Sequence, residues 1–113
     1  MRDLKLLLDG IARALTEIAL AIAGHTIESY ERAFNLPESV NWRLTVAGEA
    51  ANLLLSAQPG LENQIPELKR LIAVRHRIVH GYSSVDNDQV WAIVTSYTPG
   101  LAGRLRTFMD ELP

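Results

Sequence analysis

Apolar residues recur at three- and four-residue steps along most of the chain, a spacing that places them on one face of an α-helix. The first such stripe runs from Leu4 to Ile22, and Gly24 is placed to end it. A second follows residues 35–37 (Asn-Leu-Pro), where proline suits the first turn of a helix, and ends at residues 58–60 (Gln-Pro-Gly). No segment shows a convincing alternation of apolar and polar residues, which would be typical of strands. The pattern therefore predicts two long helices in the first half of the chain.

The second half continues in the same way. Pro66 is expected to open a third helix that runs to about His80, with Gly81 just past its end. Asp86 and Gln89 have the spacing of a capping box and predict the start of a fourth helix. Residues 98–100 (Thr-Pro-Gly) either kink that helix or begin a fifth. The predicted fold is an all-α, up-and-down bundle of four to five helices.

Length and composition fit one globular domain over residues 1–113, with 48% hydrophobic and 21% charged residues. The chain has no cysteine, which excludes disulfides, thiolate zinc sites and a cysteine nucleophile. A cytoplasmic location fits this. Asp9, Arg13 and Glu17 interrupt the apolar run near the start, so neither a membrane span nor a signal peptide is expected.

Charge is distributed unevenly. The net charge of -2 argues against a dedicated nucleic-acid-binding domain, since these are usually basic. From Leu68 to Val85, however, there is no acidic residue, and the cations of this stretch are Lys69, Arg70, Arg75 and Arg77. Two copies of the stretch in a homodimer would double the local positive field.

The segment from Arg75 to Tyr82 concentrates unusual chemistry, with two arginines, two histidines and a tyrosine in eight positions. Guanidinium and imidazole groups are suited to handling phosphates. On a helical wheel Arg75 falls within an apolar stripe, where burial of its charge is costly without a partner or a ligand. Alternatively, its stem packs on the core while its head reaches water. The stripe consists of Leu68, Leu71, Ile72 and Val79.

His80 is expected in the last turn of this helix, where it can donate a proton to a leaving oxygen or simply cap carbonyl groups. Arg75 and His80 are five positions apart, or roughly 140° around an ideal helix. One straight helix cannot aim both at one small group, so they would converge at the helix end or across a two-fold axis. The spacing thus favours a homodimer. A second apolar surface, expected to support dimerisation, contains Ala12, Ala14, Ala19 and Ala21.

Other residues are open to two interpretations. His76 and His80 are one turn apart and can pair on a metal. However, Arg77 stands where the helical motif of zinc proteases has its glutamate, and no third ligand is evident. No metal site is therefore predicted. Tyr82 presents either an accessible hydroxyl or a half-buried ring. Glu49 is expected to pair with a basic residue of the third helix.

Arg75 and the run His80-Gly81-Tyr82 together resemble the R-x-x-x-x-H-x-Y signature of HepT toxins, which belong to the HEPN superfamily of small all-α ribonucleases. Residues 48–50 resemble the G-E-A element of that family. Residues 85–94 resemble its V-D-x-x-x-V-W-x-I-V segment, and residues 99–101 its P-x-L. The likeness extends from about residue 44 to residue 105, and three elements in order make it specific.

The resemblance implies a homodimeric RNA endonuclease that needs neither metal nor cofactor. Arg75 would stabilise negative charge on the phosphorane, and His80 would act as general acid or base. The RNA 2′-hydroxyl would be the nucleophile, and a 2′,3′-cyclic phosphate the product. His76 and Arg77 would support them. Many HepT sequences have asparagine at the position of His76, although the superfamily accepts other polar residues there.

The family also implies a role for Tyr82. In type VII toxin–antitoxin pairs the matching tyrosine accepts AMP from MntA, a nucleotidyltransferase antitoxin, and the added charge and bulk silence the toxin. Two other hypotheses remain open. One is a non-catalytic HEPN bundle that binds a nucleotide or a nucleotidyltransferase partner. The other is a plain helical oligomerisation domain.

Overall fold

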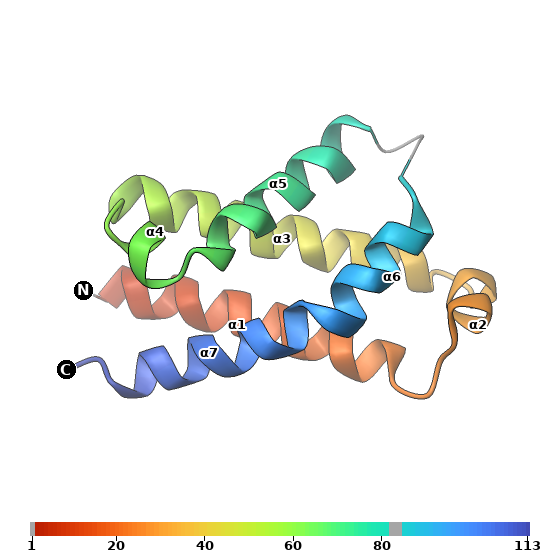
Figure 1. The fold of residues 1–113 in the computed structure, drawn as a ribbon, viewed down its shortest axis with the longest axis horizontal. Coiled ribbons are helices and arrows are strands. Elements are labelled where there is room, and N and C mark those ends of the chain that lie inside the picture. Colours follow the sequence, from red (N-terminus) through yellow and green to blue (C-terminus); the bar gives the residue numbers. More distant parts are fainter. Residues whose placement is uncertain (1, 82–84) are drawn as a thin grey trace.

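Four long helices run alternately in opposite directions along the molecule (Figure 1). They are α1 (Arg2–Ile22), α3 (Leu36–Ala57), α5 (Glu67–His80) and α7 (Thr98–Asp110). The structure is a computed structural model that describes residues 2–81 and 85–113. Helix α6 (Asn87–Ser96) precedes α7, and no strand occurs in the described ranges. The all-α, up-and-down bundle is thus confirmed.

The order of packing places α5 at one side of the bundle. Helix α1 packs against both α3 and α7, α5 packs mainly on α3, and α6 mainly on α7. One side of α5 is therefore covered by α3, while much of its remaining surface is open. Figure 1 shows α5 rising away from α6 and α7.

The core is built from the predicted apolar stripes. The α1 residues that share one face are buried, and they are Leu8, Ile11, Leu15, Ile18 and Ile22. The stripe predicted for α3 is buried throughout and comprises Val40, Leu44, Ala47, Ala51 and Leu54. Leu101, Leu105 and Met109 of α7 close the core from the other side. Periodicity alone was sufficient for these three helices.

The stripe predicted for α5 is partly wrong. Leu68 and Leu71 are buried, but Val79 is 41% exposed. Val74 and Ile78 complete the buried face instead. The apolar residues of this helix cover more than one side, and contact with α3 selects only part of them. Arg75 consequently lies at the edge of the buried face rather than in its middle.

Two short helices were not predicted, α2 (Ile27–Arg32) and α4 (Leu61–Gln64). Thr26 caps the start of α2. Its hydroxyl accepts from the Ser29 amide at 3.1 Å, while the Ser29 hydroxyl accepts from the Thr26 amide at 2.9 Å. This capping box uses serine in place of the usual glutamate or glutamine. Helices of one or two turns are too short to show a periodic stripe.

The predicted helix boundaries are mostly confirmed. Pro37 lies in the first turn of α3, and α7 begins at Thr98 as a separate helix. Asp86 caps α6 by accepting a hydrogen bond from the amide of Asp88 at 2.9 Å. The proposed reciprocal partner, Gln89, instead accepts a hydrogen bond from Arg77, so the capping-box pairing was wrong.

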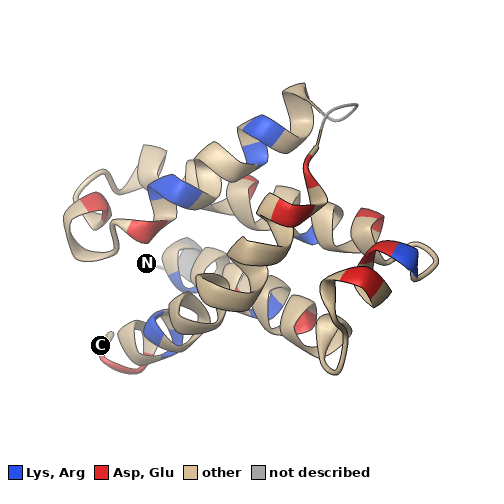
Figure 2. Ribbon diagram, turned by 45° about the vertical axis from the view of Figure 1, so that its right-hand side comes forward, with Lys and Arg blue, Asp and Glu red and all other residues tan. Residues whose placement is uncertain are grey.

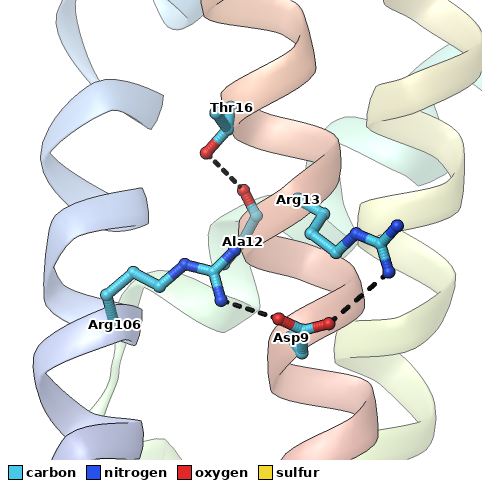
Figure 3. Close-up of polar contacts among 5 residues, drawn as sticks. All are labelled: Asp9, Ala12, Arg13, Thr16 and Arg106. Carbon is cyan, nitrogen blue, oxygen red and sulfur yellow. Dashed lines mark hydrogen bonds and ion pairs between the residues drawn. The ribbon is translucent and has the colours of Figure 1, made fainter.

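An ionic cluster joins α1 to α7 (Figure 3). The Asp9 carboxylate accepts from Arg106 of α7 at 2.6 Å and lies 3.7 Å from Arg13. The hydrogen bond from Arg106 is the main cause of a lowered Asp9 pKa. The described helices include none that is long and apolar enough to cross a membrane.

Candidate active site

Helix α5 carries all of the described candidate residues, and Figure 2 shows its lysine and arginine positions along one edge of the bundle. The helix is unbroken from Glu67 to His80, and the Gly81 amide closes it on the Arg77 carbonyl at 3.0 Å. Within one chain, the separation of roughly 140° between Arg75 and His80 around the helix is therefore kept.

Gly48 allows α3 to approach α5 closely beside Arg75. A Cβ at this position would lie 2.4 Å from the Cβ of Arg75 and 2.8 Å from the carbonyl oxygen of Leu71. Neither neighbour is the flexible end of a side chain, so only glycine fits without a shift of the helices. The close crossing places Glu49, the next residue of α3, beside Arg75.

Arg75 and Glu49 form an ion pair with 3.0 Å between the Nη2 and Oε2 atoms. The Arg75 side chain is 30% exposed and that of Glu49 is 46% exposed, so the pair is open to solvent on one side. The Nε of Arg75 is buried and has no hydrogen-bond partner within the described residues. The predicted pairing of Glu49 with the third long helix is confirmed. It compensates the charge of Arg75 at the edge of the core and fixes the direction of the guanidinium.

His76 and His80 lie together on the exposed surface of the same helix. Their ring centroids are 4.3 Å apart and the planes are inclined by 44°. Both rings lie on the exposed face of α5, where a substrate can reach them. No group of three or more metal-binding side chains is found in the described ranges.

Arg77 lies on the other side of α5 from Arg75. It donates from Nη1 to Oε1 of Gln89 on α6 at 3.2 Å. Two positions along an α-helix correspond to about 200°, which explains the separation. The structure thus does not bring Arg77 to the Glu49–Arg75 pair. Tyr82, the remaining candidate, lies outside the described residues.

Tyr97, at the junction of α6 and α7, is a further polar residue that no sequence pattern predicts. Its hydroxyl donates to the Glu67 carbonyl oxygen at 2.5 Å, and the Arg70 guanidinium lies 4.3 Å from its ring centroid. Burial, with a smaller contribution from the Glu67 carboxylate, raises the pKa of Tyr97 to about 12. No local signal marks this residue, because its partners come from another helix.

An apolar surface flanks the ion pair. Trp42, Val46 and Leu53 of α3 are 66%, 41% and 51% exposed, and their spacing places them on the same helix face as Glu49. The alanine surface predicted on α1 is wrong in part, since Ala12 and Ala14 are buried in the core at 0% and 5% exposure. The three α3 residues are a better candidate for an interface.

Comparison with known proteins identifies one family. The family described as Ribonuclease HepT-like matches residues 11–108. No curated protein and no solved structure gives a significant match. The matched range holds nearly the whole bundle, including the Gly48 crossing, the ion pair and the two histidines. With an all-α fold and this coverage, the chain belongs to the HepT-like ribonuclease family.

Proposed function

We propose that the protein is a metal-independent RNA endonuclease, the toxin of a type VII toxin–antitoxin pair. The main support is the ion pair of Glu49 with Arg75, which holds a guanidinium at the surface of the helix that also presents His76 and His80. Family membership supports a ribonuclease. A fixed cation and an exposed imidazole supply what phosphoryl transfer mainly needs, namely charge stabilisation and proton transfer.

In the proposed reaction the RNA 2′-hydroxyl loses its proton and bonds to the adjacent phosphorus. The bond from phosphorus to the 5′-oxygen breaks, and the leaving oxygen takes up a proton. The products are a 2′,3′-cyclic phosphate and a 5′-hydroxyl end. Arg75 stabilises the negative charge of the phosphorane, and His80 transfers a proton as acid or base. His76, whose ring centroid lies 4.3 Å from that of His80, supports the transfer.

The active form is proposed to be a homodimer. Trp42, Val46 and Leu53 form an exposed apolar stripe beside the ion pair, and covering it with a second copy would place the two α5 helices near each other. Arg75 of one chain can then act with His80 of the partner subunit. This arrangement resolves the separation of the two side chains around one helix.

Control by covalent modification completes the proposal. The Tyr82 hydroxyl, two positions beyond His80, attacks the α-phosphorus of ATP on an MntA-like nucleotidyltransferase and loses its proton, while pyrophosphate leaves. The attached AMP adds negative charge and bulk two positions along the chain from His80 and repels RNA.

The first test is cleavage of pooled tRNA and mRNA in EDTA by wild type, Arg75→Ala and His80→Ala proteins. Cleavage by wild type alone, with cyclic phosphate ends, is expected. Mass spectrometry of the wild-type protein must first show that Tyr82 is unmodified. No cleavage by unmodified wild type would favour the second candidate, a non-catalytic bundle that binds a nucleotide or a nucleotidyltransferase through the same basic helix.

A further inference from the structure

The side of α5 that faces α6 carries its own pair of cations, Arg70 and Arg77. They are seven residues apart, which places them on one side of the helix at about 10 Å along its axis. Together with Gln89, Ser96 and Tyr97 they line an open groove of about 460 Å³. This size lies in the range of ligand-binding sites. The groove is distinct from the surface that carries the Glu49–Arg75 pair.

Both arginines of this groove are held by neutral groups. Arg70 stacks on the Tyr97 ring at 4.3 Å, and Arg77 donates to the Gln89 amide at 3.2 Å. Within the described residues neither guanidinium has a carboxylate within 4.0 Å. Three neighbouring cations differ from these arginines because each forms an ion pair with a glutamate. The pairs are Lys69 with Glu62, Arg75 with Glu49, and Arg104 with Glu67. Arg70 and Arg77 are thus oriented without taking part in an ion pair among the described residues.

The groove continues towards the end of α5. A smaller hollow of about 70 Å³ shares Arg77, Gln89 and Ile93 with it and reaches Gly81, the residue that follows His80. Its one carboxylate, Asp86, is engaged in capping α6. A chain lying in the groove from Tyr97 to Gly81 would therefore arrive at the histidine end of α5.

We propose that this groove binds the sugar–phosphate backbone of single-stranded RNA on one side of the cleaved bond, with Arg70 and Arg77 contacting phosphates. The inference rests on the proposed ribonuclease function and extends it to the path of the substrate. Oriented guanidinium groups match phosphate oxygens geometrically, and cationic grooves with polar walls are typical of sequence-tolerant binding of single strands. An acidic protein segment would meet the same charges, but the direction of the groove towards His80 favours the substrate.

The test measures binding of a 20-nucleotide 2′-O-methyl RNA, which lacks the attacking hydroxyl and keeps every phosphate. Fluorescence anisotropy over a series of salt concentrations gives Kd for wild type and for Arg70→Gln/Arg77→Gln. We expect affinity to fall about tenfold at low salt. The slope of log K against log salt should decrease by about 1.4, or about 0.7 for each phosphate that the variant no longer neutralises. Arg70→Lys/Arg77→Lys should keep most of the slope.

The matched control is Lys5→Gln/Arg32→Gln, which removes the same formal charge from α1 and α2. It should change affinity less than twofold. Equal behaviour of the two double variants, or no RNA binding by wild type, would overturn the proposal. Cleavage by wild type with an unchanged slope would refute the groove alone. A changed slope without cleavage would refute the nuclease alone.

Discussion

Gly48 and Arg75 stand at the closest point between α3 and α5, where a methyl group on the glycine would lie 2.4 Å from the arginine Cβ. The ion pair with Glu49 depends on this contact, because Glu49 follows Gly48 directly in α3. The same glycine thus determines the packing of two helices and the position of the candidate catalytic guanidinium. Substitution of Gly48 should therefore change mainly the stability of the protein, and substitution of Glu49 mainly its activity.

Gly48→Ala should destabilise the protein by about 1–2 kcal/mol. Overpacking of a core contact costs about 1–3 kcal/mol, and the better helix propensity of alanine offsets up to about 1 kcal/mol of this. Gly103→Ala in α7 is the control, since a Cβ there meets nothing within 4 Å. It should be neutral or stabilising by up to about 1 kcal/mol. Urea unfolding measures both, and a Gly48→Ala protein as stable as wild type would show that the helices separate freely.

Glu49→Gln should lower RNA cleavage by about tenfold to a hundredfold through loss of Arg75 orientation. Its effect on the free energy of unfolding should stay below about 1 kcal/mol, because the ion pair is partly exposed. Glu62→Gln is the matched control. It breaks an exposed ion pair between Glu62 of α4 and Lys69 of α5, the helix that also carries Arg75. The kinetic readout is kcat separated from KM. Equal kcat in the two variants would exclude a positioning role for Glu49.

Much of the bundle could be predicted from one-dimensional periodicity, because α1, α3 and α7 each bury a single stripe. Helix α5 shows the limit. Its apolar residues cover more than one side, and only contact with α3 decides that Ile78 is buried and Val79 exposed. A helical wheel describes one helix and contains no information about its neighbour.

The candidate site, too, could be predicted from the sequence only in part. The pairing of Glu49 with a basic residue of the next long helix could be predicted from a lone carboxylate among small residues. The role of Gly48 could not, since it depends on the crossing point of two helices. Arg77 is two positions from Arg75 and looks equivalent in sequence, yet it contacts α6. The stacking of Arg70 on Tyr97 joins residues from two separate helices and has no local signature.

Replacing the apolar stripe should break the proposed dimer. Trp42→Glu with Val46→Glu places two charges on a surface that is now 66% and 41% exposed at these positions. Sedimentation at micromolar concentration should give twice 12.5 kDa for wild type and 12.5 kDa for the variant. Phe34→Glu, at a residue 91% exposed outside this stripe, is the control and should remain dimeric. A wild-type monomer at these concentrations would contradict the shared site.

The phenols of buried Tyr30 and half-buried Tyr97 predict a loss of stability at alkaline pH. Burial raises the pKa of Tyr30 and of Tyr97 to about 12 from an ordinary value of about 10. Below pH 10 both groups keep their protons in the folded and unfolded states, so their full contribution is present. Between about pH 10 and 12 the unfolded state loses its protons first, and the free energy of unfolding falls. Either single Tyr→Phe variant should flatten this fall.

At neutral pH, Tyr30→Phe and Tyr97→Phe should have different effects on the free energy of unfolding. The Tyr97 hydroxyl donates to the Glu67 carbonyl oxygen at 2.5 Å, so Tyr97→Phe should cost about 0.5–1.5 kcal/mol. The Tyr30 hydroxyl is buried and has no hydrogen-bond partner among residues 4–81 and 85–113. Its removal should therefore leave the free energy of unfolding unchanged or raise it by up to about 1 kcal/mol, because an unpaired buried hydroxyl is itself destabilising. Thermal unfolding at pH 7 compares the two, and a clear loss in Tyr30→Phe would indicate a bound water on that hydroxyl.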